Sequence, residues 1–291
     1  MKKITILSAV AGLTMLAAMA VQAQAGGALD ALQGYAGATA PDAPAAKAEV
    51  AGGFTKGYME PVEPAAPTAY VTIPGGKFTM GTTSIEQGFE DANFAHEVSI
   101  KTFQLAKAAV TVAQYAECVS KGACTEPTTG GYCNWGKTGR GSHPVNCVNW
   151  NQAQAYAKFK GARLPSEAEF EYAATSGGRS QKYPWGNEKP TSELAVFNTD
   201  VTMPVCSKPK GNTAQGLCDM SGNVWQWVQD KYQDSYEGAP VDGSAFEGAG
   251  SRRVARGGSF LSGGANRLRA DYRYNGDPGC RDVGVGFRLA R

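Results

Sequence analysis

The sequence from Arg256 to Leu289 reads RGGSFLSGGANRLRADYRYNGDPGCRDVGVGFRL. It opens with the frame Arg256–Phe260 and closes with the frame Gly286–Leu289. Between the frames, short residues follow one another with almost no apolar periodicity, so this stretch cannot build a hydrophobic core by itself. We therefore expect it to present side chains from a scaffold that the rest of the chain holds rigid.

Five residue types, Lys, Glu, Gln, Met and Trp, are missing from residues 260–284. The types that do occur there can all be encoded by codons derived from an Asn codon by changing its adenines. That composition is the trace expected of adenine-directed mutagenesis. A loop region rich in Gly, Asn and Asp would disfavour the same five types, so composition leaves both interpretations open.

The N-terminus has the pattern of an export signal. Two lysines at residues 2 and 3 precede an apolar run, and Ala-Gln-Ala follows at residues 23–25. We expect residues 1–25 to be a signal peptide, and the protein to be exported to the periplasm, the cell surface or the medium. A retained membrane anchor is the alternative, and membrane association is expected only in that case.

The remainder divides into a linker and one domain. Residues 26–68 are rich in Ala, Pro and Gly and are typical of a tether. Residues 69–291 have the size of one large domain. Without residues 1–25 the chain has 26 basic and 26 acidic residues, because that segment contains two lysines and no acid. Such a balance gives no reason to expect nucleic acid as a partner.

All seven cysteines lie between residues 118 and 280. In an exported protein, disulfides are the default use of cysteine. Pairing nearest neighbours gives Cys118–Cys124, Cys133–Cys147 and Cys206–Cys218, and leaves Cys280 over. Spacing alone does not fix this connectivity. Metal binding is the competing use, but there is no C-x-x-C motif and the chain has only two histidines.

Capping motifs and alternating patterns predict short helices and strands. The expected helices follow a capping box at Thr111, run over 152–160 behind Asn149 or Asn151, and follow a capping box at Ser166 to about Ala174. The expected strands are a hairpin over 70–81 that turns at Pro74-Gly75-Gly76, one strand over 97–103, and short strands at 224–228 and 286–289. The second half should otherwise consist of loops.

Seven motifs occur in an order that is highly specific. They are PGGxFxMG at 74–81, VTxxQY at 110–115, RLPSEAEFEYAA at 163–174, YPWGN at 183–187, GLxDMxGNVWxW at 216–227, RGGS at 256–259 and GFR at 286–288. Together they resemble the formylglycine-generating enzyme, or sulfatase-modifying factor, family. The resemblance covers about residues 70–291 and implies a single α+β domain of the formylglycine-generating-enzyme type, a loop-rich variant of the C-type lectin fold.

The sequence lacks residues that the enzyme activity of this family requires. Formylglycine generators hold Cu(I) between two cysteines a few residues after RGGSW and oxidise a client cysteine with O₂, and a copper–thiolate site needs two soft ligands. Residues 260–267 contain no cysteine, and Cys280 alone cannot replace the pair. We expect no copper and no formylglycine-generating activity. With only His96 and His143, the iron-binding facial triad of the related sulfoxide synthases is also missing.

The resemblance also implies structural Ca²⁺, which prefers oxygen ligands. Asn223 with the Val224 carbonyl matches one family site, and Asn198 corresponds to the other. The usual Glu of NVWEW is Gln226 here, which removes a charge and should weaken binding. The alternative is that these asparagines hold turns. His96, His143 and the acids Glu167, Glu169 and Glu171 are expected to be structural and not catalytic.

Our first hypothesis is a ligand-binding display protein. Variable proteins of diversity-generating retroelements use this fold, and the mutagenised part runs from RGGS to GFR. The candidate ligand-binding residues are Phe260, Leu261, Ser262, Asn266, Tyr272, Tyr274, Asn275, Asp277 and Asp282. Apart from Phe260 and Asn266 they are displayed positions, together with Gly263, Gly264, Gly276, Gly279, Cys280, Val283 and Gly284. The expected invariant struts are Ala265, Asn266, Leu268, Arg269, Ala270, Arg273, Pro278 and Arg281. Tyr with Ser, Gly and Asn is an adaptable paratope composition. We expect the displayed residues to contribute little to stability, and the ligand to be a protein or a glycan.

Two other hypotheses remain. One is an exported maturation enzyme or oxidoreductase, because a periplasmic relative in pyoverdine maturation lacks the copper cysteines yet is needed for an oxidation. The other is an accessory domain of an envelope complex. A nearby reverse transcriptase gene, with a near-copy of the 260–284 coding segment that differs only at adenines, would separate binding from catalysis.

Overall fold

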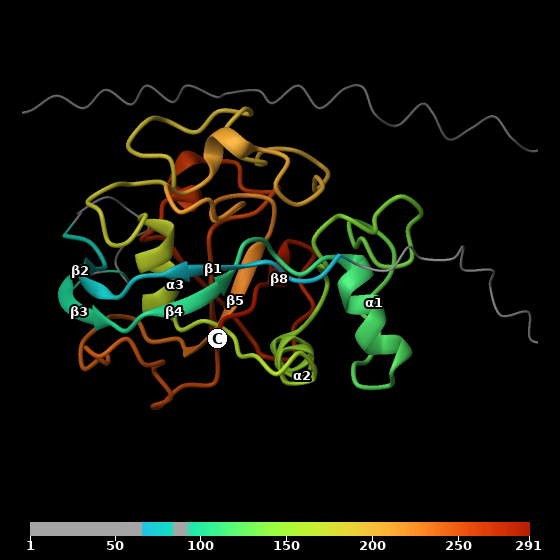
Figure 1. Cartoon of the computed structure of the whole chain (residues 1–291), viewed down its shortest axis with the longest axis horizontal. Helices are drawn as coiled ribbons and strands as arrows, with labels where there is room; N and C mark the ends of the chain where they lie inside the picture. Colours follow the sequence, from blue (N-terminus) through green and yellow to red (C-terminus); the bar gives the residue numbers. More distant parts are fainter. Residues whose placement is uncertain (1–65, 84–91, 93) are drawn as a thin grey trace, which may run out of the picture. The chain divides into compact units, whose positions relative to one another are not determined.

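The computed structural model describes residues 66–83, 92 and 94–291 (Figure 1). The expected signal peptide and nearly all of the expected linker lie outside these residues. The described part contains three α-helices and eight short strands, so the α+β class expected from the sequence is confirmed. No helix in that part is both long and apolar enough to cross a bilayer.

The predicted hairpin over 70–81 is wrong. Strand β1 (Tyr70–Ile73) pairs with β4 (Phe103–Ala106), whereas β2 (Gly76–Met80) pairs with β3 (His96–Ile100), both antiparallel. The Pro-Gly-Gly segment bends the chain without reversing it, because the Gly75 N–H donates to Thr102 Oγ1 at 3.0 Å. A Cβ at Gly75 would lie 2.5 Å from a backbone oxygen of the opposite strand. The strand predicted over 97–103 is split at the same bend.

Three capping boxes start the three helices. They are α1 (Val112–Ser120) behind Thr111, α2 (Trp150–Phe159) behind Asn149 and α3 (Glu167–Ala174) behind Ser166. In α2 the Gln152 N–H donates to Asn149 Oδ1 at 2.8 Å, so Asn149 and not Asn151 is the cap, and the helix begins two residues earlier than predicted. All eight residues of α3 are buried. Two single-turn 3₁₀ helices, η2 (Pro209–Gly211) and η3 (Ala265–Leu268), add to the loops.

A four-stranded sheet brings the two frames of the 256–289 stretch together. Its order is β7 (Arg273–Gly276), β6 (Arg253–Arg256), β5 (Trp225–Lys231) and β8 (Val285–Phe287). Strand β8 runs parallel to β5, and the other pairs are antiparallel. Gln226 lies opposite Arg256 on one side and Gly286 on the other. The segment between the frames therefore begins and ends at the same level of the sheet, and it adds the edge strand β7 in between.

Two main hydrophobic clusters support this sheet. One contains α3 with residues of β1 to β4, and the other contains α1 and α2 with Trp227 and Phe287. In the view of Figure 1, α3 lies on one side of β5 and β8, and α1 and α2 lie on the other. The disulfides are Cys118–Cys124, Cys133–Cys147 and Cys206–Cys218, the nearest-neighbour pairing, and Cys280 is a free, exposed thiol.

Candidate functional site

Both frames of the 256–289 stretch require glycine. Gly257 and Gly258 have φ values of 97° and 76°, in the left-handed region that favours glycine. A Cβ at Gly258 would lie 2.6 Å from the Leu268 side chain, and one at Gly286 would lie 2.5 Å from the Val145 carbonyl oxygen. The frames are thus fixed by close backbone packing and leave no room for variation.

Arg256 ties the opening frame to the segment that follows. Its guanidinium is fully buried and donates to the carbonyl oxygens of Ala270 at 2.8 Å and Tyr272 at 3.0 Å. It also forms an ion pair with Glu171 of α3. One buried side chain therefore fixes the path of residues 270–272.

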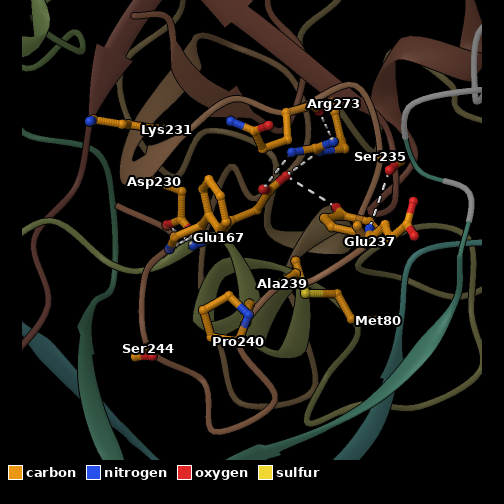
Figure 2. A pocket seen from close by; sticks show the side chains of 14 residues that line it. Met80, Glu167, Asp230, Lys231, Ser235, Glu237, Ala239, Pro240, Ser244 and Arg273 are labelled. Atoms are coloured by element: carbon orange, nitrogen blue, oxygen red, sulfur yellow. Dashed lines mark hydrogen bonds and ion pairs between the residues drawn. The ribbon is translucent and has the colours of Figure 1, made fainter. Parts of the chain in front are cut away.

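Arg273 provides the second tie to α3. Its Nε donates to Glu167 Oε1 at 2.7 Å and its Nη2 donates to Glu167 Oε2 at 3.0 Å, while the Tyr236 hydroxyl donates to Oε1 at 3.1 Å (Figure 2). Burial alone would raise the pKa of Glu167, but Arg273 and Arg256 outweigh it and lower that pKa. Glu167 is therefore held as an anion, although the sequence did not show which arginines bind it. By contrast, burial raises the pKa of Glu171 to about 7, even though the charge of Arg256 opposes that rise.

The remaining side chains of 260–284 divide by burial. Leu268, Arg269, Ala270 and Arg273 are buried, whereas Leu261, Asn266, Asp277, Cys280 and Arg281 are exposed, and Tyr272, Tyr274, Asn275 and Asp282 are half-buried. Two candidates are corrected: Phe260 is 0 % exposed and Ser262 is 1 % exposed. Ser262 closes a turn, because its hydroxyl accepts the Ser259 N–H at 3.0 Å. Neither residue can belong to an exposed binding surface.

The two tyrosines do not stand free of the scaffold. The rings of Tyr272 and Tyr274 lie 5.9 Å and 5.2 Å from the ring of buried Trp225. Such contacts contribute stability beyond buried area alone. We therefore expect this pair, which packs on Trp225, to contribute more to stability than the other displayed residues.

The displayed glycines also divide into two groups. A Cβ added at Gly263 or Gly264 would meet no atom within 4 Å. At Gly276 it would lie 2.8 Å from the ring of Trp227, and at Gly284 it would lie 3.1 Å from Ser259 Oγ. Side chains can therefore be added at the first two positions, while Gly276 and Gly284 belong to the packed frame and are removed from the displayed set.

The residues expected to bind Ca²⁺ do not fit that ion here. Asn223 is buried, and its amide bonds the Met203 backbone through both atoms, accepting at 3.1 Å and donating at 3.0 Å. Gln226 accepts from the Arg288 guanidinium, so a cation already lies at this position. Asn198 is exposed. These contacts match the turn-holding alternative, so we derive no calcium-dependent step from Asn223 and Val224.

His143 belongs to a buried polar network. Its Nδ1 lies 2.8 Å from Thr202 Oγ1 and 3.1 Å from a nitrogen of Arg140. Burial, reinforced by Arg140, lowers the pKa of His143 to about 4, so the ring is neutral at pH 7. Within the described residues, no group of three or more His, Cys, Asp or Glu side chains could hold a metal ion.

Comparison with known proteins decides the family. Residues 55–291 match the sulfatase-modifying factor enzyme 1-like domain. The chain belongs to this family. It is 31% identical to the formylglycine-generating enzyme of Streptomyces coelicolor, over 78% of this chain and 90% of that protein.

Two solved structures of this fold are similar. PvdO from Pseudomonas aeruginosa is 31% identical with a TM-score of 0.66, over 76% of this chain and 93% of PvdO. Treponema denticola variable protein 1 is 25% identical with a TM-score of 0.58, over 76% of this chain and 94% of that protein. These similarities confirm the fold expected from the seven motifs.

Proposed function

We propose that this protein is exported and binds a protein or glycan ligand with the exposed part of residues 260–284. One observation carries the proposal. Arg256 and Arg273 tie the segment to the scaffold through buried hydrogen bonds. Between and beside these ties, Leu261, Asn266 and Asp277 are exposed, and Gly263 and Gly264 face open space. A binding surface needs a rigid scaffold, with positions that accept different side chains without loss of the fold.

Three further observations support this proposal. Three disulfides are typical of an oxidising compartment, in agreement with export. The similarity to Treponema denticola variable protein 1 covers nearly the whole of that protein. The residue types missing from 260–284 are those that adenine-directed mutagenesis of Asn codons would not produce.

A display library tests the proposal. Randomising Leu261, Gly263, Gly264, Asn266 and Asp277 on yeast should leave most clones resistant to protease and should yield binders from a panel of proteins and glycans. A matched library at five buried positions should lose most folded clones. These positions are Arg256, Leu268, Arg269, Arg273 and Phe287. Equal loss of folded clones in the two libraries would overturn the proposal, because the outward positions would then be structural.

The second candidate is an exported maturation enzyme, favoured by the similarity to PvdO at 31% identity and a TM-score of 0.66. The exposed part of residues 260–284 would then bind a substrate for a reaction. Deleting the gene and comparing exported metabolites by mass spectrometry tests it. Accumulation of a precursor richer in hydrogen, restored by wild-type protein, would favour this candidate.

A further inference from the structure

Three exposed apolar residues lie on loops that are joined beside the opening frame. Tyr132, Val201 and Leu261 are 47 %, 48 % and 40 % exposed, and they are three of the five most exposed large apolar residues in the described part of the chain. Only Leu261 belongs to the 260–284 segment. We call these three residues the apolar anchor.

One ring contact and two hydrogen bonds join the loops of these three residues around buried Phe260. The ring of Tyr132 lies 6.0 Å from that of Phe260. The Thr199 N–H donates to the Phe260 carbonyl oxygen at 2.9 Å, which brings the Val201 loop alongside Leu261. The next residue after Val201, Thr202, accepts from Asn134 Nδ2 at 2.9 Å, and so ties this loop to that of Tyr132.

Hydrogen bonds and a disulfide hold the backbone at Tyr132 in place. Asn146 Nδ2 donates to the carbonyl oxygens of Tyr132 at 2.9 Å and Val283 at 2.6 Å. The Cys133–Cys147 disulfide fixes the residue next to Tyr132. A preorganised apolar surface loses little conformational entropy on binding, so it can contribute most of its buried area to affinity.

Two exposed cations lie in the chain segments that Asn146 joins at Tyr132. Lys137 and Arg281 are exposed, and no ion pair within the described residues includes either of them. Lys137 donates to the carbonyl oxygen of Gly131, the neighbour of Tyr132. Arg281 precedes Asp282, whose carbonyl oxygen accepts from Cys147 at 3.2 Å. Asp200, beside Val201, is an exposed acid at the other end of the anchor.

We propose that the apolar anchor binds a protein partner that presents an apolar side chain flanked by carboxylates. This inference rests on the proposed function and names its ligand class. Two of the three side chains are aliphatic and offer no hydrogen bond to a sugar hydroxyl, so only the Tyr132 hydroxyl could compensate the desolvation of a bound sugar. Because Tyr132 and Val201 lie outside residues 260–284, they supply a constant contact while the displayed positions set specificity.

A random 12-residue peptide library, panned on the purified protein, tests the inference. Enriched peptides should carry Leu, Ile, Phe or Trp close to Asp or Glu. Their affinity should fall about tenfold or more in a Tyr132→Ser, Leu261→Ser variant, because apolar anchors dominate binding energy. The matched control is Val241→Ser, which removes a residue that is 60 % exposed and lies outside the anchor, and it should bind as wild type.

A separate arm tells the anchor from the proposed function. Asn275→Ala with Asp277→Ala changes the displayed positions and leaves the anchor intact. Peptides that need Asn275 and Asp277 but ignore the anchor substitutions would overturn the anchor alone. The inference would be overturned by a library without enriched peptides, or by glycan binding that Tyr132→Ser leaves unchanged. It would also be overturned by peptides whose affinity changes with neither pair of substitutions. That last result would count against the proposed function as well. Thermal melting of each variant confirms folding.

Discussion

Replacing glycines one at a time inside the 256–289 stretch should separate display positions from frame positions. A Cβ at Gly276 would lie 2.8 Å from the ring of Trp227, which is 1 % exposed and part of a hydrophobic cluster. Overpacking of this kind costs about 1–3 kcal/mol. For a domain of this size that is a fall in melting temperature of about 2–12 °C. By contrast, Gly264 has no atom within 4 Å of an added Cβ, so Gly264→Tyr should stay within about 0.5 kcal/mol.

Urea unfolding followed by tryptophan fluorescence measures both variants with the disulfides intact. Gly276→Ala is the small substitution and Gly264→Tyr the large one, so side-chain size alone predicts the opposite order. An unfolding midpoint for Gly264→Tyr as low as that for Gly276→Ala would refute the reasoning. Gly263→Tyr provides a second open position and should match Gly264→Tyr.

Three further predictions follow from the cysteines, the missing copper ligands and His143. Thiol titration of the denatured, unreduced protein should give one reactive thiol, Cys280, whereas three or more would contradict the disulfides. A CxPxR sulfatase peptide incubated with the protein, Cu(I) and O₂ should show no mass shift to formylglycine. The pKa of His143 is about 4 in the folded protein, below its ordinary value near 6.5, so the unfolded chain takes up the proton first. Stability should therefore fall as the pH drops from about 6.5 to 4, and His143→Gln should fall less over that range. An equal fall would show that another group is responsible.

Much of the local structure follows from short-range chemistry. The capping boxes at Thr111 and Ser166 predicted the starts of α1 and α3, because one side chain satisfies helix N–H groups a few residues away. The pairing of β1 with β4 did not follow from the sequence. A Pro-Gly-Gly segment is typical of a reversal, and only the opposite strand and the Thr102 hydroxyl show that the chain bends and continues.

The site was less predictable than the helices, because its order comes from distant partners. Arg273 and Glu167 are 106 residues apart, and no sequence pattern pairs them. Phe260 was expected on the surface because it follows the RGGS frame, yet it is buried beneath Tyr132. Tyr132 and Val201 were missed because both lie in irregular loops, where no periodicity in the sequence shows which apolar side chain is exposed.

The most direct test of diversification is the DNA sequence around the gene. If the exposed part of residues 260–284 is a diversified ligand surface, a near-copy of that coding segment should lie close to a reverse transcriptase gene. The differences between the two copies should occur at adenines of the template, and should fall in the codons of outward positions such as Leu261, Gly264, Asn266 and Asp277. A locus with no such copy, or differences spread evenly over Arg256, Leu268 and Arg273, would contradict the account.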